Sequence, residues 1–159
     1  MAAAGGWVIG GAFGQNSQDR SSNAVRQSLR ALGRLLLAEP EAVLAVHQEN
    51  LLAALGERAG VMAALVPEFE LILPGVEPVL PGGDPQVAQS QIHQAALDVL
   101  RLISASRPVV MLLDNMQWAA GFPLGMIDAL LTAHDLPGLL LVGAYRDREL
   151  SPERPFARC

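Results

Sequence analysis

The strongest constraint on the fold is an unbroken apolar run that ends in a carboxylate. Residues 109–114 read Val-Val-Met-Leu-Leu-Asp. Continuous hydrophobicity of this kind is typical of a strand buried in a parallel sheet, where both faces are covered. In open α/β sheets, ligands bind beyond the carboxyl ends of the strands, and Asp114 falls at that end. The run therefore predicts an α/β fold and supplies the first candidate site residue.

Two other segments are predicted to be strands of the same sheet. Residues 7–13 form a short β-strand whose glycines relieve close packing or mark a bend, and residues 139–144 form a second buried run. The remaining sequence predicts a long helical insert over about 23–106 and one further helix around 124–131. Strands that alternate with helices pair in parallel through right-handed crossovers. This order predicts a three-layer α/β domain.

Several helix boundaries within the insert are also predicted. Ser22 or Asn23 is suited to cap the first helix, because a short polar side chain can accept from the free backbone N–H groups. Asp84 followed by Pro85 is suited to open the last helix in the same way. Pro67 is expected to bend or interrupt a short helix between residues 61 and 73.

The chain contains no lysine, and its 11 basic residues are all arginine. A phosphate-binding loop of the GxxxxGK[ST] type cradles phosphates with backbone N–H groups and uses a lysine to reach the β and γ oxygens. This sequence cannot form such a loop. A strand-end aspartate such as Asp114, by contrast, is the type of residue that holds magnesium in nucleotide hydrolases. The two observations together predict half of an ATP site.

Composition limits the other functions. The 159 residues, 51% of them hydrophobic, suit one domain with a sizeable core. The formal net charge of −5 argues against a nucleic-acid partner, because phosphate neutralisation needs a concentrated basic patch. Four arginines come nearest to such a patch, but their spacing scatters them around a helix and its entry, which favours a solvated face over a binding stripe. They are Arg20, Arg26, Arg30 and Arg34.

The sequence gives further expectations about location and chemistry. No stretch reaches the roughly 18 uninterrupted apolar residues that a membrane span needs. Cys159 is the sole cysteine, so no intrachain disulfide can form and a cytoplasmic location is expected. His47, His93 and His134 lie on separate predicted helices without matching ligands, which argues against a metal site among them.

Two segments carry a family resemblance. Residues 112–119 read Leu-Leu-Asp-Asn-Met-Gln-Trp-Ala, and residues 143–149 read Gly-Ala-Tyr-Arg-Asp-Arg-Glu, about 30 residues further on across one helix. Residues 11–15 and 65–70 add less specific matches. In these segments the chain resembles the AAA-type P-loop ATPase module of large bacterial signalling ATPases and multidomain kinases, which is related to the Orc1-like AAA family.

The resemblance implies a P-loop NTPase-like fold and roles for three residues. Asp114 would hold the Mg²⁺ of a bound MgATP. Asn115 stands where members of the family usually have a second acid, and an amide cannot act as a general base near neutral pH. Arg146 lies at the tip of a sensor-like strand over residues 139–146, where its charge would detect the γ-phosphate. Ala120 also departs from the family, in which an aspartate is common after the Trp-Ala pair.

The resemblance also implies that part of the family's module is missing. The phosphate-loop strand of the family precedes the equivalent of residues 7–13 and lies beside the sensor strand. Residues 1–159 would then be a partial AAA-type ATPase domain with a partial parallel sheet, in which the three strands are neighbours in chain order. An upstream phosphate-loop segment, or neighbouring domains of a larger signalling protein, would complete the site. Without it, residues 139–144 form an apolar edge, which invites pairing.

A second hypothesis belongs to a different class of function. The α/β scaffold could serve as a non-enzymatic protein-interaction domain, with residues 23–73 contacting a partner. Trp118 is expected to pack into the core in either case, because a tryptophan just after a buried strand is more often packed than stacked on a base.

Overall fold

The computed structural model describes residues 5–15 and 23–146 of the chain. Three strands alternate with helical segments, as the sequence predicts. In chain order the elements are β1 (Trp7–Ala12), α1 (Ala24–Leu37), α2 (Glu41–Leu55), the 3₁₀ turn η2 (Gly56–Arg58), α3 (Ala59–Leu65), α4 (Pro67–Ile72), α5 (Pro85–Ser106), β2 (Val109–Asp114), the 3₁₀ turn η3 (Met116–Trp118), α6 (Phe122–Thr132) and β3 (Leu139–Gly143).

The strands form one parallel sheet in the order β1-β2-β3. Ile9 of β1 lies opposite Met111 of β2, which in turn lies opposite Leu141 of β3. The α/β class, the parallel pairing and the neighbour order are therefore confirmed. The strand predicted over residues 109–114 forms with those bounds, whereas β3 ends at Gly143, three residues before the predicted end of the sensor-like strand at Arg146.

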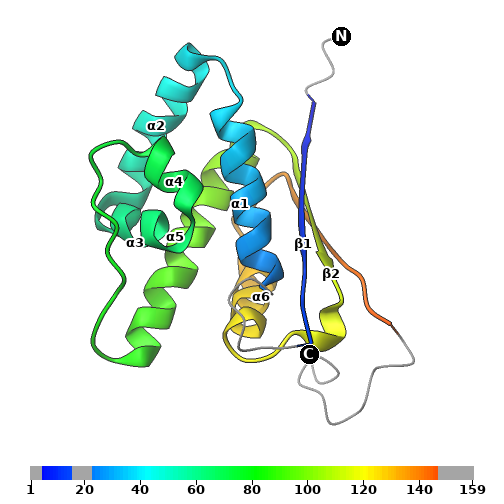
Figure 1. Ribbon diagram of the computed structural model, residues 1–159. Coiled ribbons are helices and arrows are strands. Elements are labelled where there is room, and N and C mark those ends of the chain that lie inside the picture. Colours follow the sequence, from blue (N-terminus) through cyan, green and yellow to red (C-terminus); the bar gives the residue numbers. More distant parts are fainter. Residues whose placement is uncertain (1–4, 16–22, 147–159) are drawn as a thin grey trace.

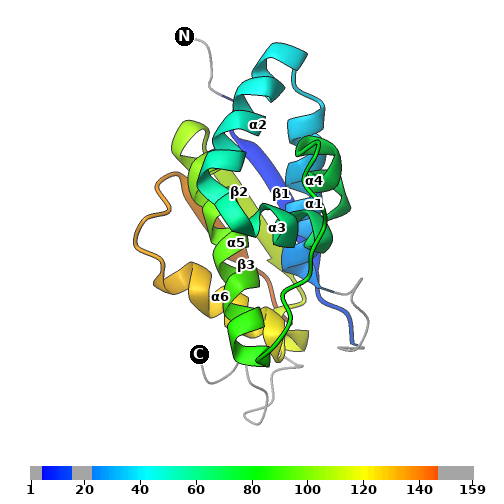
Figure 2. The same ribbon diagram turned by 90° about the vertical axis from the view of Figure 1, so that its left-hand side faces the viewer.

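The described helices cover only one face of this sheet (Figures 1 and 2). Because consecutive strands are neighbours, right-handed crossovers carry every connecting helix to the same side. The opposite face stays open: Val8 is 62% exposed and Leu140 is 57% exposed, and Leu112 between them is 42% exposed. The third layer that the sequence predicts is therefore not formed by the described residues.

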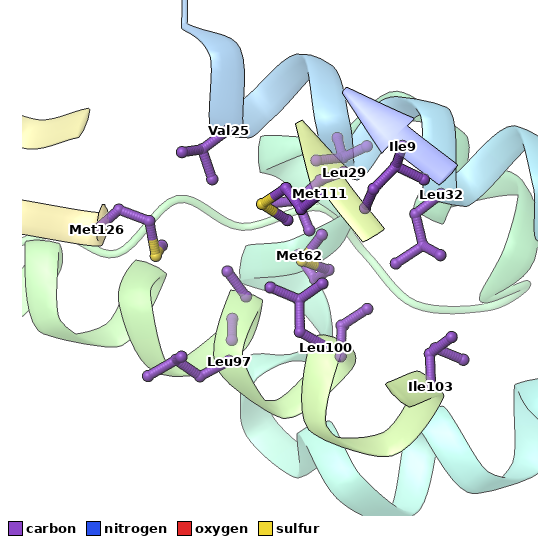
Figure 3. Packing of buried hydrophobic residues seen from close by; sticks show 14 of the residues in the cluster. Ile9, Val25, Leu29, Leu32, Met62, Leu97, Leu100, Ile103, Met111 and Met126 are labelled. Atoms are coloured by element: carbon purple, nitrogen blue, oxygen red, sulfur yellow. The ribbon is translucent and has the colours of Figure 1, made fainter. Parts of the chain in front are cut away.

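The core lies between the covered face of the sheet and the helical insert (Figure 3). Ile9 and Met111 point from the sheet toward Leu29 of α1 and Leu100 of α5, and all four side chains are 1% exposed or less. Trp118 is partly buried against the same cluster, as predicted. Burial of this apolar surface is the main stabilising contribution to the fold.

The predicted helix boundaries are confirmed at the N-terminal caps Asn23 and Asp84 and at the helix interruption before Pro67. Asn23 Oδ1 accepts the backbone N–H groups of Val25 and Arg26 at the start of α1. Asp84 Oδ1 accepts the N–H groups of residues 86 and 87 at the start of α5. Val66 separates α3 from α4, which has Pro67 in its first turn. The structure describes no helix long and apolar enough to cross a bilayer.

The arginines of α1 correct one sequence expectation, because they are not simply a solvated face. Arg30 Nε donates to both carboxylate oxygens of Glu68 at 3.1 Å, and Arg34 Nε donates to Oε1 at 3.2 Å. Arg26 Nε donates to the carbonyl oxygen of Leu65 at 2.8 Å. These three side chains tie α1 to the end of α3 and the start of α4, within the 65–70 segment. Arg20 lies outside the described residues.

Glu68 is expected to make the stability of this contact depend on pH. Burial raises the pKa of its carboxyl, but the hydrogen bonds and charges of Arg30 and Arg34 outweigh burial, so the pKa is lowered from the ordinary 4.5. A lowered pKa in the folded state stabilises the fold above pH 4.5, and this contribution disappears as the pH falls through the lowered value. Glu68→Gln is therefore expected to cost about 1–2 kcal/mol at pH 7, and less at pH 3. Urea unfolding at both pH values measures the difference.

Glu70→Gln is the matched control for this prediction, because Glu70 is an exposed glutamate of the same helix. It is expected to change the free energy of unfolding by less than about 0.5 kcal/mol at either pH. An equal cost of Glu68→Gln at pH 3 and pH 7 would contradict the ion-pair explanation.

Candidate functional site

The carboxyl ends of the three strands are joined by backbone hydrogen bonds. Phe13 N donates to the carbonyl oxygen of Asp114 at 3.0 Å, which extends the β1–β2 pairing by one residue. Ala144 N donates to Leu113 O at 2.8 Å, and Met116 N donates to Ala144 O at 2.9 Å. Asp114, at the end of the middle strand, is therefore flanked by the ends of both neighbours, where parallel sheets bind ligands.

The exposed carboxylate of Asp114 is available to a ligand on one side. Its Oδ1 accepts the backbone N–H of Asn115 at 2.7 Å, which caps the strand end. Within residues 5–15 and 23–146, no three His, Cys, Asp or Glu side chains gather into a group that could hold a metal ion. Mg²⁺ in phosphate-transfer sites is commonly held by one or two carboxylates, with phosphates and water completing its shell. Asp114 thus fits magnesium only as one ligand of a magnesium–phosphate complex.

Asn115 turns the chain sharply after the strand. It is the one non-glycine residue with positive φ in the described part, with φ 56° and ψ 41°. Asparagine tolerates this left-handed conformation better than most residues, because its short polar side chain can bond locally. The side chain is half-buried beside Asp114 and provides an amide where the family resemblance would place an acid. This turn provides polarity but no general base.

Arg146 is held at its backbone. Its N–H donates to Oε1 of Gln117 at 3.3 Å, at the long end of the usual range. Gln117 belongs to η3 and is only 2% exposed. The structure thus links the turn after Asp114 to the predicted sensor residue through a buried amide. Gln117 belongs to the 112–119 motif, but no residue pattern predicted its bond to Arg146. Asp147, Arg148 and Glu149 lie outside the described residues.

The end of β1 is shaped by a second glutamine. Gln27 of α1 accepts from Ala12 N at 3.0 Å and donates to Ala12 O at 3.2 Å, on the side of β1 that faces away from β2. A Cβ on Gly11 would lie 2.3 Å from Ala24 O, so only glycine permits this approach of α1 to the strand. Local sequence patterns gave no signal for Gln27, because the contact joins residues 15 positions apart.

Two further features of residues 5–15 and 23–146, a partly buried histidine and an apolar hollow, do not resemble a phosphate site. His93 stacks at a tilt on Phe122, with ring centroids 4.9 Å apart, and burial lowers its pKa. A hollow of about 210 Å³ between the sheet and α6 has almost entirely apolar walls, with Asp128 as its one charged residue. Its lining offers few groups that could bind phosphate. The full lining is Leu113, Met116, Leu124, Ile127, Asp128, Leu131, Leu141 and Gly143.

The fold and the strand-end acid define the class of protein. A parallel α/β sheet with an aspartate at the carboxyl end of its middle strand is typical of nucleotide-binding domains. In agreement with this, the sequence matches the AAA ATPase domain over residues 1–142, and the chain belongs to that family. Asp114 and Asn115 lie within the match, and Arg146 lies beyond it. Comparison with curated proteins gives no match, and neither does comparison with solved structures.

Proposed function

We propose that this chain is part of the ATP-binding module of a signalling ATPase, related to the Orc1-like AAA proteins. It contributes magnesium and γ-phosphate contacts to a nucleotide site that a separate phosphate-loop segment completes. The observation that carries the proposal is the position of Asp114 between the ends of β1 and β3, in a sequence without lysine. The family membership supports ATP and Mg²⁺ as the ligands, because AAA ATPase domains generally bind both.

Each candidate residue has a defined role in this proposal. Asp114 would be a ligand of Mg²⁺, and the ion would supply charge neutralisation to the bound nucleotide. Asn115 orients water through its amide but cannot remove a proton from it, so the module binds ATP without efficient hydrolysis. Arg146 reads the charge of the γ-phosphate, which distinguishes ATP from ADP. In a complete module, this difference drives a conformational switch.

The two edges of the sheet support completion on the β3 side. On the outer edge of β1, the N–H and C=O groups of Ala12 are already hydrogen-bonded to the Gln27 side chain. The described residues add no strand beyond β3, and its sequence Leu-Leu-Leu-Val-Gly has no charge or proline to discourage pairing. A strand that pairs there places its following loop beside Ala144 and Arg146. A helix after that loop would cover the open face around Leu112 and Leu140.

Calorimetric titration tests the proposal on the chain by itself. MgATP is expected to give no measurable binding heat, because the sequence has neither a lysine nor a GxxxxGK[ST] loop. The same titration with Asp114→Ala is the control and should be indistinguishable. Micromolar affinity that Asp114→Ala abolishes would show instead that the chain holds a complete site, and the half-site proposal would be wrong.

One surface favours the alternative function, a non-enzymatic protein-interaction domain. α2 is apolar around most of its circumference, a pattern that is usually buried, yet only Leu51 and Leu55 are buried. Val43 and Val46 are exposed on its outer side. This surface belongs to the 23–73 region that the alternative assigns to a partner. Light scattering separates the hypotheses: a defined dimer favours the interaction domain, and heterogeneous aggregation favours an incomplete module.

The cytoplasmic location and the lack of a nucleic-acid partner remain predictions from composition.

A further inference from the structure

Gln117 lies between the two parts of the candidate site. It follows Asp114 by three residues, and its side-chain amide accepts the backbone N–H of Arg146, 29 residues further along the chain. An amide that is 2% exposed is far from bulk water, so losing a partner carries the desolvation cost of a buried polar group. The geometry at Arg146 therefore depends on where η3 holds this side chain.

The position of η3 depends in turn on the strand end. Asn115 N–H is bonded to the Asp114 carboxylate, and Asn115 O accepts Trp118 N at 2.9 Å. These bonds connect the Asp114 side chain directly to the 3₁₀ turn that contains Gln117. A change in the carboxylate, such as a cation that draws it away from Asn115, acts at the first residue of this turn.

The turn also contacts the end of β3. Met116 N donates to Ala144 O, and a Cβ on Gly143 would lie in ordinary van der Waals contact with Met116 Cγ, at 3.4 Å. The main-chain bond sets the separation between η3 and the end of β3. The bond from Arg146 N–H to Gln117 then holds the backbone two residues beyond Ala144.

We propose that Gln117 is a positioning residue that transmits the state of the Asp114 carboxylate to the backbone of Arg146. The functional meaning of this coupling rests on the proposed function, in which Asp114 binds magnesium and Arg146 reads the γ-phosphate. Occupation of the metal position then sets the place of the sensor arginine, so that it responds to magnesium and phosphate together. A nucleotide without its metal would leave the sensor segment in its unliganded position.

Amide hydrogen exchange in the ¹⁵N-labelled full chain tests the link. Gln117→Met keeps the size of the side chain and removes the acceptor, so exchange at the Arg146 amide is expected to rise about tenfold or more. The Ala144 amide, bonded to Leu113 O, should not change. Gln117→Glu retains an acceptor oxygen and should restore slow exchange. Should Gln117→Met fail to fold, Gln117→Asn keeps an amide that is too short to reach Arg146, and the same rise is expected.

Gln27→Met is the matched control, because Gln27 also bonds a strand-end backbone, but at Ala12. It should leave Arg146 exchange unchanged. Transmission is tested by Asp114→Asn, which should shift the Arg146 amide resonance in the natural sequence and not in the Gln117→Met background. Unchanged exchange in Gln117→Met, or an equal shift in both backgrounds, would overturn the proposal. These readouts use no nucleotide, so they stand apart from the ATP titrations that decide the proposed function.

Discussion

Gly11→Ala is expected to lower the free energy of unfolding by about 3 kcal/mol, the upper part of the range for overpacking a core. The added methyl would lie 2.3 Å from Ala24 O and 2.7 Å from Gln27 Cβ. The nearest atom is backbone of α1, which cannot rotate away as a side-chain end can. Relief therefore requires α1 to move off β1, and that movement opens the packing of Leu29 against Ile9. Urea unfolding followed by circular dichroism measures the loss.

Gly82→Ala is the control for this prediction, because a Cβ at Gly82 meets no atom within 4 Å. It is expected to change the free energy of unfolding by about 0.5 kcal/mol or less. If Gly11→Ala unfolds at the same urea concentration as the natural sequence, the close approach of α1 to the sheet is wrong. The Gln27 cap on Ala12 would then be in doubt as well, because the same approach places it.

The strands and their order could be predicted because their signals are local or follow from chain connectivity. Consecutive apolar residues in 109–114 indicated a buried strand, and helices between strands require parallel crossovers. The end of β3 was predicted less well. Ala144 still bonds to Leu113 and Met116 like a strand residue, but the chain leaves the ladder after Gly143. The apolar run stops at Ala144, and the predicted end at Arg146 rested on the family resemblance rather than on apolar composition.

The layers show a limit of the same reasoning. Continuous hydrophobicity in 109–114 predicted burial on both faces, yet Leu112 is 42% exposed in the described structure. A residue pattern reports the surroundings that a strand is suited to. It does not report whether the covering elements lie within the same sequence. The open face around Val8, Leu112 and Leu140 is therefore consistent with a covering layer supplied by the completing segment of the proposed function.

Within the candidate site, the sequence predicted candidate residues but not the hydrogen bonds that connect them. Asp114, Asn115 and Arg146 could be named from motif positions. Two hydrogen bonds could not be predicted, the one from Arg146 to Gln117 and the one from Ala12 to Gln27. Each joins residues far apart in the chain through one side chain. The ion pairs of the α1 arginines could not be predicted for the same reason. Their spacing suggests a solvated helix face, and only the fold brings Glu68 against them.

Joining a phosphate-loop segment to this chain is expected to raise its affinity for MgATP by about 100-fold or more, equivalent to about 2.7 kcal/mol. The segment would consist of an apolar strand, a GxxxxGK[ST] loop and the following helix, taken from another AAA ATPase domain. The strand would pair with β3, whose outer edge is open in the described structure, and the loop would then lie beside Ala144. Backbone N–H groups and the new lysine would bind the phosphates directly, whereas Asp114 is proposed to act on them only through magnesium. Calorimetry measures the affinity of the joined protein, and the unmodified chain, which is expected to give no binding heat, sets a lower limit on the gain.

Two variants of the joined protein show whether the gain has the proposed origin. Replacing the loop lysine by alanine tests the added half, and Asp114→Ala tests the half that this chain supplies. Each is expected to lose most of the gain, because in the proposed site magnesium would need both Asp114 and the phosphates as ligands. Asp128→Ala is the control, since Asp128 is an exposed carboxylate of α6 and lines the apolar hollow. Full MgATP affinity in the Asp114→Ala protein would mean that the strand-end aspartate is only a cap for Asn115, and the magnesium role would be wrong.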